Sequence, residues 1–333
     1  MAPSQSDPSR PEEDSLPLDH SHILLTSFNS FLTVAIHNIL YYRNIYPAPT
    51  FLSTKAYNLP VHQNRHPKVC TWIRNAVDAV AAQLSTGHVS RIAILIHSPY
   101  ESTPSPAHDP SPSSEVSNPT LSTPSPQSLP ASVPPGSVLE RWLIDTSRFP
   151  SWPSAANANF NSSGEPTGPS ATETAKGMRD FARVLARDAR SEDARERHLA
   201  PDPRNPTFNW PDLDEQLRGA LRRMASVAEG MPPLPVEGCT FTVAVELAEA
   251  GRAPIGYPQA WIPSEPNLQT KGRGRETAGE DIGGVRTRPI RAVEAGPLFF
   301  ECWVEDSRAK DALMRMSETG KGEYQTQGST QPV

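Results

Sequence analysis

VSRIAILIH, residues 89–97, is the stretch that decides the fold class. It is short, rich in β-branched residues and apolar at consecutive positions, which is typical of a strand covered on both faces in the middle of a sheet. VLERWLI, residues 138–144, has a similar character and is the expected partner strand. We expect the two to form a hairpin with a long loop, because the entropy of loop closure rises only with the logarithm of loop length.

Helical periodicity precedes this pair of strands. Apolar residues recur every three or four positions from Leu24 to Tyr42, and again from Val69 to Leu84. Prolines after the first run and Gly87 after the second predict where each helix ends. Between the two helices, residues 57–60 are expected to form an extended linker.

Fewer regular elements are expected toward the C-terminus. A third helix is predicted from Pro211 to about Gly230, and strands are predicted at 239–247 (CTFTVAVEL) and 298–304 (LFFECWV). The stretch between these strands has no periodicity and the tail after Asp306 is polar, so neither is expected to form regular structure. Helices segregated from a mostly antiparallel sheet predict an α+β domain.

Composition limits both the ordered length and the function. Of 37 prolines in the 333 residues, 10 lie in residues 101–137 beside 11 serines, so this segment is expected to be disordered. The net charge of −6 disfavours nucleic-acid binding as the main activity, because phosphate contacts need a basic excess. Cys70, Cys239 and Cys302 are far apart, which favours a reduced intracellular compartment. We expect neither a membrane span nor a signal peptide.

No catalytic or metal-binding motif is found. The sequence has no GxSxG, GxxxxGK[ST], HExxH or CxxC pattern. His20 and His22 come nearest to a pair of metal ligands, and we interpret them as incidental because no further ligand pattern accompanies them. Lys271–Arg275 could contact phosphate or serve nuclear import, although a few basic residues in a loop are more simply explained by solubility. Composition and motifs together predict a non-catalytic binding module without metal or cofactor.

Four tryptophans are candidates for a binding surface. Trp142 and Trp303 lie in expected strands, and Trp72 is one position off the apolar stripe of the second helix. Trp261 lies between two prolines in the aperiodic segment. Large aromatic side chains near a sheet edge suit peptide binding, because they give contact area at small entropic cost. The simpler interpretation is that all four are core residues, and we favour it for Trp142.

Several blocks of sequence resemble a known family. In chain order they are FLTVAIHNILYYRNIYP (31–47), KAYNLPV (55–61), His66–Pro67, GCTFTV (238–243), Trp261–Ile262 and WVED (303–306). They are similar to the HORMA-domain accessory subunits of DNA polymerase zeta, which are also known as mitotic-arrest-deficient-like proteins. The resemblance implies three helices packed on an antiparallel sheet, followed by a C-terminal segment called the safety belt.

The resemblance also implies a division of the chain. The HORMA domain would cover residues 20–306, with the safety belt at about 248–306. Outside it would lie a disordered tail at 1–19 and a polar tail at 307–333. Disordered or mobile insertions are expected at 101–137, 147–209 and 270–286.

Function and site residues follow from the same resemblance. In this family the belt closes over a proline-containing peptide of the polymerase catalytic subunit, and a second surface meets the C-terminal domain of a Y-family scaffold polymerase. The resemblance implies an adaptor in nuclear translesion DNA synthesis. By position, Trp72 and Trp261 match the peptide contacts, and Thr287, Glu301 and Trp303 match the scaffold contacts.

Three questions stay open at this point. Relatives pair through the third helix, but their contact residues are replaced here by Ser53, Gly219 and Gly230, so a homodimer is uncertain. A spindle-checkpoint HORMA protein that clasps a checkpoint partner is the main alternative, and KAYNLPV and the context of Trp261 favour the polymerase subunit. A hydrolase with an unrecognised site is the third hypothesis, and no spacing of a nucleophile and a base supports it.

Overall fold

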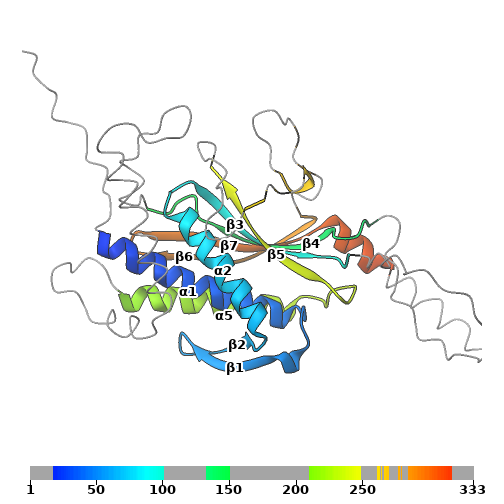
Figure 1. Cartoon of the computed structure of the whole chain (residues 1–333), viewed down its shortest axis with the longest axis horizontal. Coiled ribbons are helices and arrows are strands. Elements are labelled where there is room, and N and C mark those ends of the chain that lie inside the picture. The colour runs from blue at the N-terminus through cyan, green and yellow to red at the C-terminus, as the bar shows by residue number, and fades with distance from the viewer. Residues whose placement is uncertain are drawn as a thin grey trace, which may run out of the picture.

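The computed structural model describes residues 18–100, 133–150, 210–248 and 284–316, together with a few positions between 261 and 279 (Figure 1). It contains three main helices and two antiparallel sheets. The elements are α1 (Leu18–Tyr42), η1 (Ala48–Thr50), β1 (Phe51–Ala56), β2 (Leu59–Asn64), α2 (Pro67–Leu84), β3 (Val89–His97), β4 (Val138–Asp145), α5 (Trp210–Gly230), β5 (Thr240–Leu247), η2 (Pro266–Leu268), β6 (Arg286–Ala295) and β7 (Leu298–Asp306). Residues 308–316 form a further short helix.

The larger sheet has five strands in the order β5-β3-β4-β7-β6. β3 and β4 pair in antiparallel register, with Ile94 opposite Trp142, which confirms the expected long-loop hairpin. β3 lies between β4 and β5; Ile92, Ile94 and Ile96 on one face are fully buried, and Ala93 and Leu95 on the other face are 9% and 3% exposed. The continuous apolar pattern of this strand therefore has the expected cause: both of its faces are covered.

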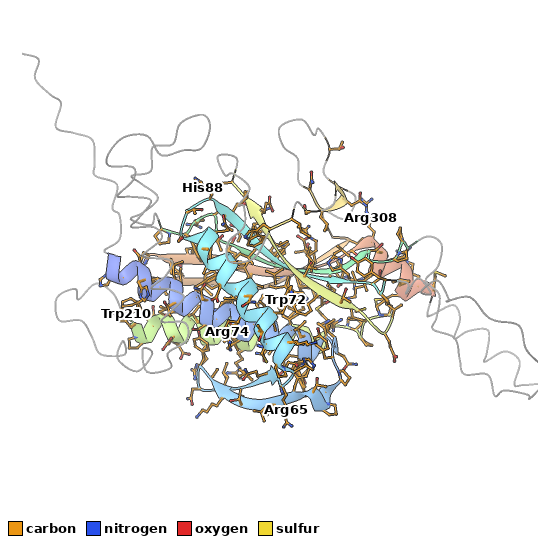
Figure 2. All side chains as sticks on the ribbon, in the orientation of Figure 1. Arg65, Trp72, Arg74, His88, Trp210 and Arg308 are labelled. Carbon is orange, nitrogen blue, oxygen red and sulfur yellow. The ribbon has the colours of Figure 1, made fainter. Side chains whose placement is uncertain are left out.

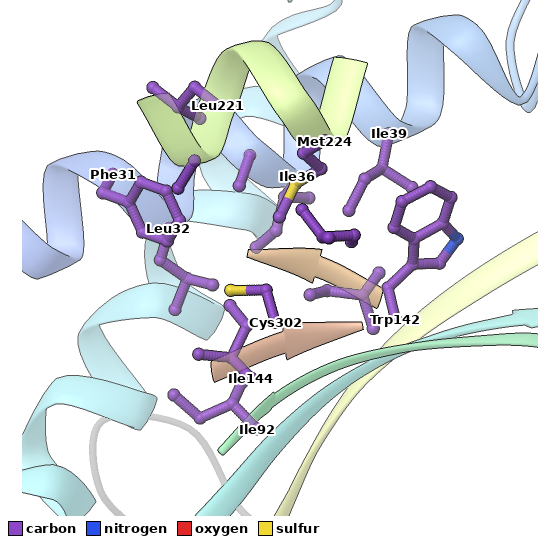
Figure 3. Packing of buried hydrophobic residues seen from close by; sticks show 14 of the residues in the cluster. Phe31, Leu32, Ile36, Ile39, Ile92, Trp142, Ile144, Leu221, Met224 and Cys302 are labelled. Atoms are coloured by element: carbon purple, nitrogen blue, oxygen red, sulfur yellow. The ribbon is translucent and has the colours of Figure 1, made fainter. Parts of the chain in front are cut away.

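The main core lies between the sheet and the three helices, which gather on one side of it (Figure 1). Alternate sheet residues point into this layer, among them Trp142, which is 1% exposed, as the core interpretation predicts. Phe28 of α1 meets Phe300 of β7 edge-to-face, with ring centroids 5.3 Å apart. Figure 3 shows α1 and α5 side chains packed on the sheet around Cys302. The α+β architecture predicted from the sequence is confirmed.

Helix α1 contradicts the expectation that no segment is apolar enough to span a membrane. His20–Tyr42 is long and apolar enough to resemble a membrane span, contrary to the expectation that no run is. Two thirds of its most apolar window is buried inside the domain, so its hydropathy is explained by packing against α2, α5 and the sheet. A helix that is hydrophobic on more than one side is a core helix in this setting.

The sequence did not predict the β1–β2 hairpin, strand β6 or the helix at 308–316, and one region was assigned wrongly. Residues 57–60 are not an extended linker: Tyr57 and Asn58 turn the chain between β1 and β2 with φ of 49° and 56°. Strand β6 occupies part of the stretch expected to be irregular, and residues 308–316 are helical in the tail expected to lack structure. Both segments are stabilised by tertiary contacts, β6 by pairing with β7 and the helix by the buried Lys310.

The proposed insertions fall largely outside the described residues, namely at 101–132, 151–209 and most of 270–283. Their edges are ordered: Val133 is 2% exposed, and Phe149 packs edge-to-face on Phe28 with centroids 5.0 Å apart. Residues 133–137 and 147–150, at the edges of the segments 101–137 and 147–209, are therefore part of the described structure.

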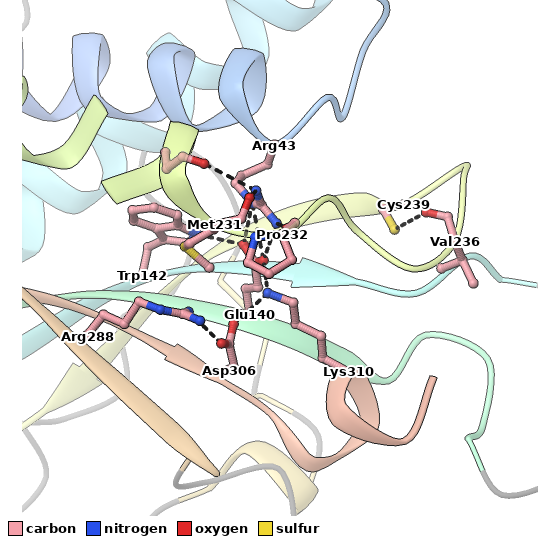
Figure 4. A network of polar contacts seen from close by, with 11 residues as sticks. Arg43, Glu140, Trp142, Met231, Pro232, Val236, Cys239, Arg288, Asp306 and Lys310 are labelled. Carbon is pink, nitrogen blue, oxygen red and sulfur yellow. Dashed lines mark hydrogen bonds and ion pairs between the residues drawn. The ribbon is translucent and has the colours of Figure 1, made fainter. Parts of the chain in front are cut away.

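A buried network of charges joins the ends of α1 and α5 to β4, β7 and the C-terminal helix (Figure 4). Arg43, which directly follows α1, donates to the Glu140 carboxylate from Nε and Nη2, at 3.0 and 2.7 Å. Arg43 also donates to the carbonyl of Pro232, which follows α5, at 2.7 Å. Lys310 donates from Nζ to Glu140 and to Asp306, the latter at 2.6 Å. The side chains of Arg43, Glu140 and Lys310 are each at most 2% exposed, so every charge depends on its partners.

Candidate functional site

A cavity of about 590 Å³ opens beside the exposed side of α2. It lies between the start of α2 and the start of β5, and residues from the segment after α1 and from the turn into α2 also line it. Its walls include Tyr46, Asn64, His66, Lys68, Trp72 and Phe241. We refer to this cavity as the α2–β5 groove. Few polar atoms line it, so it suits an apolar side chain of a ligand.

Trp72 lies in this groove because of its place on the helix. Ile73 and Val80 belong to the α2 face that packs into the core, and Trp72 precedes Ile73 by one position. It therefore emerges at the border of the core, with 36% of its surface exposed (Figure 2). Its ring meets Phe241 of β5 edge-to-face, with centroids 4.9 Å apart and an interplanar angle of 78°. Two aromatic side chains from distant parts of the sequence thus form one apolar wall.

The groove runs along a free sheet edge. β5 is the outermost strand on its side and pairs only with β3 among the described residues. Thr240, Phe241 and Thr242 at its start line the cavity. An edge strand presents backbone N–H and C=O groups that an extended peptide can pair with as an added strand. The groove therefore combines a backbone template with a pocket for a side chain.

Hydrogen bonds fix the turn that leads into α2. The backbone N–H of Asn64 donates to Nδ1 of His37, at 3.3 Å, and the Asn64 side chain donates to Thr50 Oγ1, at 3.2 Å. The N–H of His66 donates to Asn64 Oδ1, at 2.8 Å. Burial lowers the pKa of His37 from 6.5 to about 4, so the ring is neutral at neutral pH and can accept the bond from Asn64. These bonds hold the first turn of α2 in place against the groove.

Trp261 does not line the groove. It is partly buried against the main core, in the connection between β5 and β6. Its indole Nε1 is buried and has no hydrogen-bond partner among the described residues. The two residues expected to contact a peptide are therefore not brought into one wall. The role of Trp261 as a peptide contact stays a prediction.

The connection that carries Trp261 has to cross the whole sheet. β5 is one edge strand and β6 is the other, so the chain between Leu247 and Arg286 passes from edge to edge. Leu268 in this connection packs on the sheet face away from the helices, against a small cluster that includes Leu95 and Trp303. The safety belt expected at about 248–306 stays a prediction, because most of residues 249–283 lie outside the described part of the chain.

The three expected scaffold contacts come together on the opposite half of the sheet. Glu301, Trp303 and Glu305 alternate along β7 and so share one face, and Thr287 of β6 is directly opposite Glu305. Trp303 Nε1 donates to Glu305 at 2.8 Å, and the Arg91 guanidinium lies 5.9 Å from the Trp303 ring centroid. Thr287 and Glu301 are exposed, whereas Trp303 is partly buried. The outer face of β6–β7 is thus a candidate second surface.

The described residues offer little for catalysis or metal binding. No group of three or more His, Cys, Asp or Glu side chains is arranged for a metal within the described part of the chain. His20 is buried, with its ring 5.7 Å from that of Trp210 in an edge-to-face contact. Burial raises the pKa of Cys239 to about 11 and that of Cys302 still further, so both are protonated thiols at neutral pH.

A family profile for the HORMA domain matches residues 25–108. These residues supply α1, the β1–β2 hairpin, α2 and β3, which include the helical wall of the groove. The chain contains a HORMA domain. The match also covers His37, Asn64 and Trp72.

Similarity to individual proteins extends beyond this domain profile. The DNA polymerase zeta processivity subunit of Schizosaccharomyces pombe is 24% identical over 279 residues, which cover 84% of this chain and 90% of that protein. The mitotic spindle assembly checkpoint protein MAD2B of Homo sapiens and that of Rattus norvegicus are each 32% identical over 88 residues. That match spans 25% of this chain and 42% of MAD2B.

Solved structures of distant sequence are also similar. A chain in the crystal structure of the mitotic checkpoint complex is 15% identical, with a TM-score of 0.46, over 86% of this chain and 98% of that one. The structure of C. elegans HTP-1 bound to the HIM-3 closure motif is 14% identical, with a TM-score of 0.43, over 89% and 93%.

Several residues of the HORMA-domain groove were not found from the sequence. Phe241 was recognised only as part of a strand, and its contact with Trp72 joins positions far apart in the chain. Lys68 and Asn64 carried no motif at all. Pro67 is the first residue of α2, where the missing N–H of a proline costs nothing. Gly219 and Gly230 correspond to residues through which relatives pair. Gly219 faces Arg291 of β6, and Gly230 has open space around it.

Proposed function

We propose that this HORMA-domain protein is the non-catalytic adaptor subunit of a translesion DNA polymerase zeta. It would clasp a proline-containing peptide of the catalytic subunit in the α2–β5 groove, beneath the connection between β5 and β6. It would also bridge that subunit to the C-terminal domain of a Y-family scaffold polymerase, in the nucleus. The observation that carries the proposal is an apolar cavity beside a free strand edge, in a chain that aligns over most of its length with a polymerase zeta processivity subunit.

The geometry supports capture of an extended peptide. Pairing with β5 would supply backbone hydrogen bonds, and the wall formed by Trp72 and Phe241 would receive an apolar side chain. Proline suits such a segment because its fixed φ lowers the entropy that binding must overcome. A belt that closes over the peptide has to open before the peptide leaves, so slow dissociation would contribute most of the affinity.

The position of the second surface supports bridging. The groove lies at the β5 edge, whereas Thr287, Glu301 and Trp303 lie on the half of the sheet formed by β6 and β7. Two partners bound at these places would not compete for the same strands. A protein of this kind can therefore hold both partners at once, which is what an adaptor between two polymerases requires.

A spindle-checkpoint role is the second candidate, because the name of the MAD2B relatives refers to spindle assembly. Both functions use a peptide clasp, so the groove alone does not separate them. The partners do. Purification of the tagged chain from its own cells, followed by mass spectrometry, should recover a polymerase catalytic subunit. Recovery of checkpoint kinetochore proteins without a polymerase subunit would contradict the first proposal in favour of the second.

Binding to the groove itself is tested with the purified chain. A peptide from the recovered partner should bind the native protein and should bind the Trp72→Ala variant at least about tenfold more weakly, as is usual for an aromatic side chain at the centre of an interface. Met316→Ala, which removes an exposed apolar side chain from the C-terminal helix, is the control. Equal affinity of the native protein and the Trp72→Ala variant would place the peptide elsewhere.

A further inference from the structure

The first part of the HORMA domain has an unusual charge pattern. The whole chain is acidic, with 37 Asp and Glu against 31 Lys and Arg. From His20 to Val77, however, there is no Asp or Glu, while Arg43, Lys55, Arg65, Lys68 and Arg74 all occur there. One part of an acidic protein is therefore purely basic, and this part includes the helical wall of the α2–β5 groove.

Most of these cations are free to meet a ligand. Arg43 is the exception, because it is buried against Glu140. Arg65, Lys68 and Arg74 are exposed and have no ion-pair partner among the described residues (Figure 2 labels Arg65 and Arg74). Lys68 lines the groove itself, and Arg65 lies in the turn just before α2. The groove thus has an apolar wall bordered by positive charge.

The backbone at the start of α2 adds to the positive electrostatic potential of these cations. Helix α2 has no side-chain cap at His66 and no acidic residue in its first turn. The partial positive charge of the helix N-terminus is therefore not offset by a carboxylate within the first turn itself. A ligand that covers Lys68 removes part of its hydration. A ligand with a negative charge beside Lys68 therefore binds more tightly, because its charge offsets the lost hydration. A ligand without such a charge binds more weakly.

The spacing of Lys68 and Trp72 predicts the position of the negative charge on the ligand. Lys68 and Trp72 are four positions apart on α2, about 6 Å between neighbouring side chains on one helix face. In an extended peptide, side chains on the same face repeat about every 6.7 Å, which is two residues. An apolar residue against Trp72 therefore brings the residue two positions away close to Lys68.

We infer that the guest peptide carries an Asp or Glu about two residues from the apolar residue that fills the α2–β5 groove, paired with Lys68 and the positive field of Arg65 and the start of α2. This inference rests on the proposed peptide-binding function and adds a specificity to it. The preference is for an acidic flank on one side of the apolar residue, at short spacing.

A peptide library tests this directly. The probe is a set of displayed 12-residue peptides with a fixed central proline, in which the positions two and five residues away carry Asp/Glu, Asn/Gln or Lys/Arg. When the library is selected for binding to the full chain, Asp or Glu should be enriched at one of the two positions that lie two residues from the proline. No enrichment is expected at the positions five residues from it. The selected acidic peptide should bind about tenfold more tightly than its Asn/Gln counterpart, and less so as salt is raised.

Charge reversal identifies the residue responsible. Lys68→Glu should fold normally, since an acid is favourable in the first turn of a helix, and should switch the preference to Lys/Arg. Arg308→Glu, which reverses an exposed arginine on the C-terminal helix, is the matched control and should keep the acidic preference. Neutral peptides enriched as often as acidic ones, or an unchanged preference in Lys68→Glu, would overturn the inference while leaving peptide binding intact.

Two other results have distinct meanings. If no peptide of any charge is enriched, the proposed function itself fails. If a double-stranded 20-mer DNA displaces the selected peptide at 150 mM salt, and Lys68→Glu abolishes this displacement, the basic surface is a nucleic-acid site and the inference of an acidic peptide is wrong. We expect no displacement, because so few exposed cations make few phosphate contacts.

Discussion

Replacing Glu140 with Gln should strongly destabilise the fold, because this carboxylate neutralises two buried cations. Arg43 and Lys310 both bond to it, and its side chain is completely buried. A glutamine of similar size removes the negative charge and places an NH₂ donor against other donors. Removing one partner of a buried charge pair costs about 3–5 kcal/mol of unfolding free energy. For an ordered region of this size that corresponds to a fall in Tm of about 6–20 °C.

Urea unfolding followed by circular dichroism measures this change. Lys310→Met should also destabilise, but combining it with Glu140→Gln should cost less than the sum of the two, since the double variant has one buried cation fewer. Asp311→Asn breaks the exposed pair with Arg315 and is the matched control, with an expected change of a few tenths of a kcal/mol. If Glu140→Gln lowered the unfolding free energy by less than about 1 kcal/mol, the negative charge of Glu140 would not be what stabilises the two buried cations.

Three further outcomes follow from the groove and its surroundings. The pKa of His37 is about 4 in the folded state and 6.5 in the unfolded state, so its neutral ring contributes its full stability above pH 6.5. This contribution, about 3 kcal/mol of unfolding free energy, is lost as the pH falls from 6.5 to 4. In His37→Gln, the unfolding free energy should therefore depend less on pH over this range. Trp72→Ala should weaken peptide binding while changing Tm little, since the side chain is partly exposed, and a large fall in Tm would show a core role instead. Trp261→Ala should also weaken peptide binding with the fold retained, and unchanged affinity in calorimetry would remove it from the clasp.

The elements that could be predicted from the sequence are those with a local pattern of apolar residues. α1, α2 and β3 have apolar patterns that match their burial. The β1–β2 hairpin was missed because its turn uses Tyr57 and Asn58 at positive φ, where glycine or Asn-Gly is the usual signal. β6 was missed because Pro289 lies at a break in its pairing with β7, and a proline inside a short charged run argues against a strand.

The site was predictable only in part, for a similar reason. Trp72 could be selected because its place off the apolar stripe is a local property. Its contact with Phe241 depends on which strand becomes the sheet edge, and no local pattern contains that information. The buried network did leave a signal: Glu140 and Arg141 interrupt an otherwise apolar strand, and a charge in such a strand predicts a buried partner.

The crossing from β5 to β6 leads to a final prediction about the belt. The two edge strands are four strand spacings apart, which is about 19 Å. The chain from Leu247 to Arg286 would reach more than about 100 Å when extended, so it far exceeds the crossing. Deleting residues 270–283 would still leave about 80 Å of reach, enough to pass around a guest on the β5 edge. Peptide affinity should therefore survive this deletion in calorimetry. Loss of binding in a variant with unchanged Tm would mean that the deleted residues themselves hold the peptide.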